Sequence, residues 1–134
     1  MKYFACFLSA LVILGTSACK KDSGAKGNTT LQGKWKVIGS MISSGGPMYF
    51  VPDNGNHYAQ FNTDGTITGS AFPDEVYYKI KDSITITMTK ADKITYEDYY
   101  YKIKQDSLTL GPAGPIVCIE GCSIKLIKDW VGLN

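Results

Sequence analysis

Very few side chains of this 134-residue chain have the types and spacing that catalysis requires. An enzyme of the common hydrolytic kinds needs a nucleophile with a base, or paired acids in a cleft. His57 is the only histidine, and no serine or cysteine motif lies beside it. Glu97 and Asp98 form the only acidic pair inside a predicted strand, but adjacent strand residues point to opposite faces of a sheet. We therefore expect a protein that is not an enzyme.

Two cysteines near the C-terminus have the spacing of a small disulfide loop. Cys118 and Cys122 enclose Ile-Glu-Gly, and Gly121 makes a tight loop feasible. Together with His57 they fall short of the four ligands of a structural zinc site, so we expect no metal and no other cofactor. The spacing, with no helix after it, does not suit redox catalysis either. In an oxidising compartment the two thiols are expected to form a disulfide.

The N-terminal segment predicts export to such a compartment. Lys2 precedes an apolar run over residues 4–14, and small residues lead up to Cys19, which is the order of a secretory signal peptide. The run is shorter than the roughly 20 apolar residues of a transmembrane helix. The segment resembles a lipobox, which implies a lipoprotein whose residues 1–18 are removed and whose Cys19 carries diacylglycerol and palmitate. The alternative is ordinary cleavage after Ala18, which leaves a free thiol.

Residues 19–30 predict a flexible tether between that lipid and one folded domain over residues 31–134. Lys20 to Thr30 are polar except for one alanine, and they include Gly, Ser and Lys. Lys20-Lys21-Asp22 is similar to the signal that directs Bacteroidetes lipoproteins to the cell surface, and a solvated linker explains it equally. We expect a protein held in the outer membrane by its N-terminal lipid, on the periplasmic or the cell-surface face.

The composition excludes nucleic acid as a partner. Cleavage after Ala18 leaves 134 − 18 = 116 residues, and loss of Lys2 leaves 14 − 1 = 13 basic against 12 acidic residues, a net charge of about +1. That charge creates no field that would attract a polyanion. The chain contains no arginine, so it also lacks the planar group that grips phosphate in a bidentate manner.

From Gly33 onward the sequence alternates apolar and polar residues between turn signals, as half-buried antiparallel strands do. Ile84 to Thr89 alternate without exception, and Asp64-Gly65 favours a tight hairpin. The pattern predicts eight strands, at residues 33–40, 57–63, 66–72, 75–81, 83–89, 96–104, 107–111 and 122–128. Because the joins are short, we expect an all-β fold, a single eight-stranded up-and-down antiparallel barrel.

Two of the predicted turns carry a second pattern. Asp82-Ser83-Ile84 and Asp106-Ser107-Leu108 fit the acceptor pattern of Bacteroidetes O-glycosylation. Turn formation by short hydrogen-bonding side chains explains both equally well.

One face of these strands is apolar and is expected to fill the barrel. Its members alternate with Lys and Thr along each strand. They are Trp35, Val37, Ala59, Phe61, Ile67, Val76, Tyr78, Ile80, Ile84, Ile86, Met88, Tyr99, Tyr101, Ile103, Leu108, Leu110, Ile124 and Leu126.

The start of the domain resembles small bacterial lipocalin-like lipoproteins. Leu31 to Trp35 supply a Gly-x-Trp on the first strand, and Phe61 to Thr66 repeat the strand-turn-strand sequence that follows it in that family. The resemblance implies a barrel closed at one end by Trp35 and open at the other for a small apolar ligand. In lipocalins an arginine on the last strand stacks over that tryptophan, and Lys125 is the expected counterpart here.

Two groups of aromatic residues are candidates for the ligand site. Met48, Tyr49 and Phe50 lie in a long first loop between Gly-Gly and Pro residues, and they form either a lid over the barrel mouth or a plug that completes the core. Alternation directs Tyr78, Tyr99 and Tyr101 inward, where their hydroxyls either face a ligand or their rings only stabilise the sheet. With Trp35 at the closed end, these residues form the expected site for a small apolar or amphipathic molecule.

An alternative function belongs to a different class. If the barrel is filled by its own side chains, the outward tyrosines, Tyr77 and Tyr100, together with the Cys118 to Cys122 loop, would bind another protein. The protein would then be a non-enzymatic binding or inhibitor module.

Overall fold

The computed structural model of this protein describes residues 30–118 and 122–130. These residues form strands and connecting segments and contain no helix. None of them belongs to a helix long and apolar enough to cross a membrane. The predicted signal peptide, Cys19 and the predicted tether up to residue 29 lie outside the described residues.

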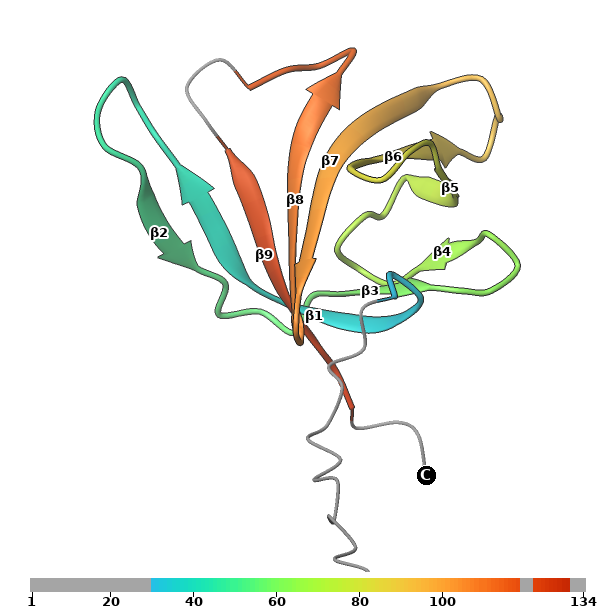
Figure 1. Cartoon of the computed structure of the whole chain (residues 1–134), viewed down its shortest axis with the longest axis horizontal. Coiled ribbons are helices and arrows are strands. Elements are labelled where there is room, and N and C mark those ends of the chain that lie inside the picture. The colour runs from blue at the N-terminus through green and yellow to red at the C-terminus, as the bar shows by residue number, and fades with distance from the viewer. Residues whose placement is uncertain (1–29, 119–121, 131–134) are drawn as a thin grey trace, which may run out of the picture.

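Nine strands follow one another along the described chain (Figure 1). They are β1 (Gly33–Ile42), β2 (Tyr49–Pro52), β3 (Tyr58–Phe61), β4 (Ile67–Thr68), β5 (Glu75–Ile80), β6 (Thr85–Lys90), β7 (Tyr96–Lys104), β8 (Ser107–Gly114) and β9 (Ser123–Lys128).

Eight of these strands form a nearly closed barrel, which confirms the predicted fold. Their order is β4-β3-β1-β9-β8-β7-β6-β5, and every paired neighbour is antiparallel. The ends of this path meet where Thr66 bridges to Tyr77 and the Tyr78 N–H donates to the Gly65 carbonyl at 2.8 Å. The chain therefore runs up and down around the barrel. Its first strand, β1, pairs with its last strand, β9, and the narrow remaining gap lies between β4 and β5.

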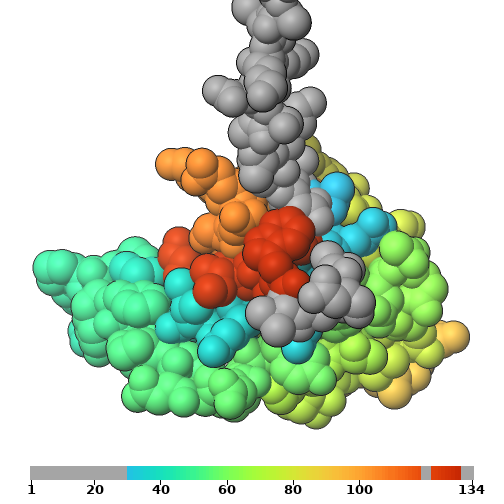
Figure 2. Space-filling view, turned by 90° about the horizontal axis from the view of Figure 1, so that it is seen from below, coloured from blue at the N-terminus to red at the C-terminus, as the bar shows by residue number. Residues whose placement is uncertain are grey.

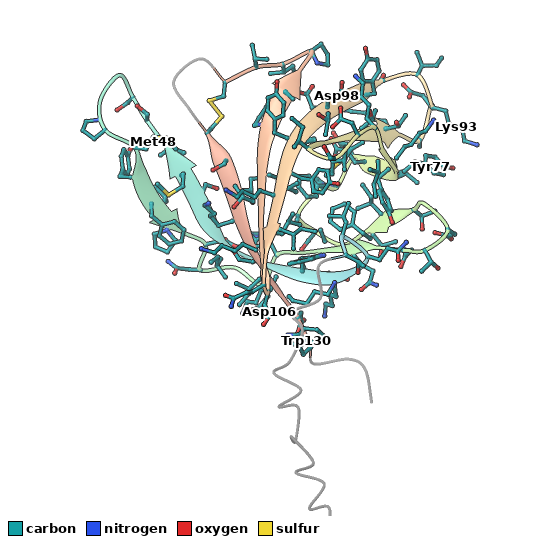
Figure 3. All side chains as sticks on the ribbon, viewed as in Figure 1. Met48, Tyr77, Lys93, Asp98, Asp106 and Trp130 are labelled. Atoms are coloured by element: carbon teal, nitrogen blue, oxygen red, sulfur yellow. A yellow bond between two sulfur atoms is a disulfide. The ribbon has the colours of Figure 1, made fainter. Side chains whose placement is uncertain are left out.

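The two ends of the barrel differ. Because the strands run up and down in sequence order, the short turns before β4, β6 and β8 lie at one end together with the end of β9, and the longer connections lie at the other end. We call these the closed end and the open end. Figure 3 labels Asp106, in the turn before β8, close to Trp130, which follows β9. Figure 2 views the closed end, where the last part of the described chain, in red, lies beside β1, in cyan.

The ninth strand replaces the long first loop expected from the sequence. β1 continues to Ile42, and its last four residues pair with β2, from Gly39 opposite Pro52 to Ile42 opposite Tyr49. β2 pairs with no strand other than β1, so it is not part of the ring, and Figure 1 shows this hairpin beside the barrel. The hairpin forms because two segments that favour strands flank the Ser-Ser-Gly-Gly-Pro turn.

The barrel core contains most of the predicted inward residues. Ten of them are buried, and Tyr78, Tyr99, Tyr101, Ile103 and Ile124 pack against these while partly exposed. Leu31 and Phe72, which the alternation did not identify, also belong to the core. The buried members of the predicted set are Trp35, Val37, Ala59, Phe61, Ile67, Ile86, Met88, Leu108, Leu110 and Leu126.

Ile80 and Ile84 were wrongly expected to fill the barrel, since they are 50% and 57% exposed. Both lie where the β5–β6 hairpin turns. The Ile84 N–H donates to the Asp82 carboxylate at 2.9 Å, so Ile84 belongs to the turn and the inward alternation begins only with Ile86. Strict alternation in the sequence therefore extended beyond the strand that it predicted.

The Asp64-Gly65 turn supports a direct prediction. Gly65 has φ +84°, and an added Cβ would lie 3.5 Å from the nearest atom, the Tyr78 carbonyl oxygen, so the cost of a side chain is almost wholly conformational. Gly65→Ala should lower the free energy of unfolding by about 1 kcal/mol, measured by urea denaturation. Gly46→Ala is the matched control and should be nearly neutral, because a Cβ there meets nothing within 4 Å and the backbone has no positive φ. Equal losses in both variants would contradict this account.

Candidate ligand-binding site

The closed end is sealed by Trp35 and Lys128. The Trp35 side chain is fully buried, and its Nε1–H donates to the Leu31 carbonyl at 2.6 Å. Trp35 pairs in register with Lys128, whose Nζ lies 4.3 Å from the indole centroid and donates to the Gln32 carbonyl. Burial lowers the pKa of Lys128, and the charge of Asp106 partly opposes this shift. A cation thus covers the indole at the end of the barrel.

This arrangement corrects the assignment of Lys125 as the residue over Trp35. Lys125 pairs with Gly39, and its Nζ donates to the Thr109 hydroxyl at 2.8 Å. Because Ile124 and Leu126 were placed inward, the same alternation directs Lys128 inward and Lys125 outward. The sequence therefore held the signal for the correct lysine.

Side chains fill the half of the barrel next to the closed end. The Tyr78 hydroxyl donates to the Asn62 carbonyl at 2.8 Å, and its ring meets Phe61 edge-on at 5.1 Å. The Tyr101 hydroxyl contacts the Asp82 carbonyl at 3.4 Å. Both hydroxyls thus face backbone carbonyls at turns. The largest fully buried side chains are those of Trp35, Phe61, Ile86, Met88, Leu108, Leu110 and Leu126.

A pocket of about 320 Å³ lies at the open end, between β5, β6, β7 and the segment that follows β8. Polar groups of Glu75, Lys90, Thr95 and Glu97 contribute to its wall. Its apolar and aromatic lining consists of Met88, Tyr96, Tyr99, Pro112, Pro115 and Ile116. We call this cavity the Tyr99 pocket. Its size is at the lower end of the range for small-molecule sites.

The electrostatics of the Tyr99 pocket are unusual for a barrel interior. Burial raises the pKa of Tyr99 to about 12, and the nearby charges of Glu75 and Glu97 add to this shift. Glu97 Oε2 accepts from the Ile116 N–H at 3.3 Å, whereas Oε1 is buried and meets no hydrogen-bond donor of the described residues. The pocket therefore combines an apolar wall with one unsatisfied carboxylate oxygen.

Glu97 and Asp98 face opposite sides of the sheet. Asp98 binds Lys81 Nζ at 2.8 Å and the Thr87 hydroxyl at 2.5 Å, and these contacts, Lys81 first, lower its pKa. Asp98 is thus part of a surface network, and Glu97 alone of the pair faces the pocket.

A second pocket, of about 390 Å³, lies between the end of β2 and the start of β3 and contains His57. His57 Nδ1 lies 3.0 and 3.1 Å from the two carboxylate oxygens of Asp53, which also accepts from the Gly55 N–H at 3.2 Å. The hydrogen bond from His57 is the main cause of the lowered pKa of Asp53. These contacts fold the short loop between the two strands. Among the described residues no group of three or more potential metal ligands is found.

The candidate protein-binding residues lie on the outer face of the sheet and in the connection between β8 and β9. Tyr100 is exposed and lines a shallow groove with Ile84, Lys102 and Gly111. Lys93 Nζ lies 5.1 Å from the ring centroid of Tyr77. The sulfur atoms of Cys118 and Cys122 are bonded, with a Cα–Cα distance of 5.8 Å.

Only one of the predicted ligand-binding residues, Tyr99, lies in the Tyr99 pocket. Trp35 is at the opposite end, and Tyr78 and Tyr101 contact backbone carbonyls away from it. Met48, Tyr49 and Phe50 are exposed on the β2 hairpin and line neither pocket at the open end, which corrects the expectation that they cover the mouth.

Sequence reasoning missed Glu97 and the residues around the β8 end. The inward positions of Tyr99 and Tyr101 imply an inward Glu97, because all three have the same parity on one strand. Pro112, Pro115 and Ile116 gave no such signal, since they follow the regular part of β8 and its pairing with β7 shifts register there.

Comparisons with known proteins leave the family open. No family model matches the chain, and no curated protein matches it in sequence. The likeness to lipocalin-like lipoproteins thus depends on the Gly-x-Trp segment and the turn at residues 61–66.

Proposed function

We propose that the open end of the barrel binds a small amphipathic molecule in the Tyr99 pocket. The pocket itself carries the proposal, because it places apolar residues, the Tyr99 ring and the carboxylates of Glu75 and Glu97 around a cavity of about 320 Å³. Small-molecule sites have this composition, a mostly apolar lining with a few convergent polar groups. The filled closed half supplies a rigid base beneath it.

We also propose that the protein is a lipocalin-like lipoprotein, attached by Cys19 to the outer membrane. The N-terminal sequence and the nearly closed eight-stranded barrel support this proposal. In such a protein the lipid is attached on the N-terminal side of β1, which begins at Gly33 at the closed end, whereas the pocket lies at the opposite end. A ligand would then reach the pocket from the side away from the attachment point.

One observation favours a second candidate function, that of a protein-binding or inhibitor module. The closed half is filled, and the exposed Tyr100 borders a groove of about 780 Å³ on the outer face of β7 and β8. Exposed tyrosines are common at the centres of protein interfaces. In this alternative the barrel is only a scaffold, and Tyr100 and the Cys118 to Cys122 loop contact the partner.

Methionine methyl groups allow the ligand proposal to be tested directly. The chain contains four methionines, of which Met88 lies in the floor of the Tyr99 pocket and Met48 is exposed on the β2 hairpin. Titration of the full chain, labelled with ¹³C at its methionine methyls, with hexan-1-ol should shift the Met88 resonance in a saturable manner. Met48 should move little and without saturation.

The opposite result is equally clear. If Met88 stays unchanged up to the solubility limit of hexan-1-ol, or if Met48 shifts as much as Met88, the pocket does not bind small amphipathic molecules. The outer face would then be the remaining candidate site.

A further inference from the structure

Glu97 is placed where a structural carboxylate is costly. Its position on β7, two residues before Tyr99, directs it toward the Tyr99 pocket, and its Oε1 atom is buried. Only Oε2 has a partner, the Ile116 N–H at 3.3 Å. Burial of a carboxylate oxygen without a donor lowers stability, and a cation bound beside the carboxylate would offset that cost through its charge.

The charges around Glu97 leave the pocket negative. Glu75 lines the same pocket, and none of the ion pairs among the described residues includes Glu75 or Glu97. Lys90 is the one cation in the lining, and its Nζ is bound to Asp74 at 3.2 Å, on the solvent side. Two carboxylates thus face one small cavity without a cation bound to either.

The rest of the lining suits the body of an organic cation. Tyr99 presents an aromatic ring, which attracts cations through its π face, and Phe72 holds this ring edge-on at a centroid distance of 5.8 Å. Pro112, Pro115 and Ile116 supply apolar surface for a short hydrocarbon chain, and the buried Met88 lies next to them in the lining. An anion would meet two carboxylates here, and a purely apolar molecule would leave Oε1 buried without a donor.

We propose that the Tyr99 pocket selects small amphipathic ammonium ions, with the Glu97 carboxylate facing the ammonium group and the Tyr99 ring beside it. This inference rests on the proposed function and names the chemical class of its ligand. The alkyl part of the ligand lies against Ile116 and the prolines. Glu75 contributes through its charge and not through a direct bond.

Three ligands with the same carbon chain test the inference. The methyl-labelled full chain is titrated with hexylammonium, hexan-1-ol and hexanoate at neutral pH and constant ionic strength, and Met88 reports binding. Hexylammonium should bind at least about tenfold more tightly than hexan-1-ol, since hydrogen bonds to charged groups are the stronger ones. Hexanoate should bind more weakly than both.

Two variants with equal charge changes identify the residue responsible. Glu97→Gln should bring hexylammonium close to hexan-1-ol while leaving binding of the alcohol within about twofold of the unmodified chain. Asp98→Asn removes a carboxylate one residue away on the other face of β7, and it should keep the tenfold preference. The Met88 resonance in the absence of ligand shows whether each variant retains the pocket.

The possible failures are distinguishable. If hexan-1-ol binds and hexylammonium binds no better, the ammonium inference is wrong and the proposed function stands. If Glu97→Gln and Asp98→Asn reduce the preference equally, the selection comes from overall charge and the assignment to Glu97 is wrong. If no ligand of the series shifts Met88, the proposed function fails and the inference fails with it.

Discussion

Trp35→Ala should lower the free energy of unfolding by about 3–5 kcal/mol, the usual cost of removing a buried large aromatic side chain. Trp35 is fully buried, and its loss leaves a cavity at the centre of the closed end. It also leaves the Leu31 carbonyl without the indole donor, which lies at 2.6 Å, and Lys128 without the ring beneath its ammonium group. Urea unfolding of the full chain, followed by circular dichroism, measures this loss.

The second tryptophan provides the control. Trp130 lies beyond the end of β9 and is 49% exposed, so Trp130→Ala removes the same side chain from a surface position. We expect a change of roughly 0.5 kcal/mol or less. Similar losses in the two variants would mean that the closed end is not packed around Trp35.

The barrel could be predicted from the sequence because its signals are local. Apolar and polar residues alternate along β6 and β9, and Asp64-Gly65 specifies a tight turn through the positive φ that Gly65 adopts. Short turns make consecutive strands neighbours, so the meander follows from the turns alone. Closure needs one further long-range step, the pairing of β1 with β9, which an eight-stranded barrel requires.

The β2 hairpin could not be predicted in the same way. Met48 to Val51 form a short apolar segment, which is equally consistent with a lid, a plug or a strand, because periodicity does not identify the partner. The structure pairs this segment with the C-terminal part of β1, from Gly39 to Ile42, on the edge of β1 that faces away from β9. The extra length of β1 decides the matter, because its second half stays paired with β9 and has β2 in place of β3 on its other side. Nothing in the sequence marks this change of neighbour.

The candidate site was predicted only in part, for a related reason. Glu97 and Asp98 cannot act as a catalytic pair, because they face opposite sides of the sheet. The same alternation makes Glu97 an inward charge beside Tyr99. A single inward carboxylate cannot form an acid–base pair. It does indicate a place where a bound cation would be stabilised, because a buried charge is costly unless it is paired. The Pro112 to Ile116 wall depends on the irregular end of β8, where local patterns carry no information on position.

Lys128→Ala should lower the free energy of unfolding by about 2–3 kcal/mol, the second largest loss that we expect. The variant removes a desolvated cation from the Trp35 ring, worth up to about 2 kcal/mol, and a hydrogen bond from a charged group to the Gln32 carbonyl, worth about 1.5–3 kcal/mol. Relief of the desolvation that lowers the pKa of Lys128 offsets part of this loss. Urea unfolding at neutral pH, where the unfolded lysine is charged, measures the net effect.

Lys125→Ala is the matched control for this prediction, since Lys125 lies on the same strand with its Nζ bound to Thr109 on the outer face. Its loss should cost about 0.5 kcal/mol or less. The double variant Trp35→Ala/Lys128→Ala should lose about 1–2 kcal/mol less than the sum of the two single variants, because each single change already removes their shared contact. Trp35→Ala combined with Lys125→Ala should be additive. If Lys125 and not Lys128 couples to Trp35, the register of β1 against β9 differs from Trp35 opposite Lys128, and the closed end would need a different seal.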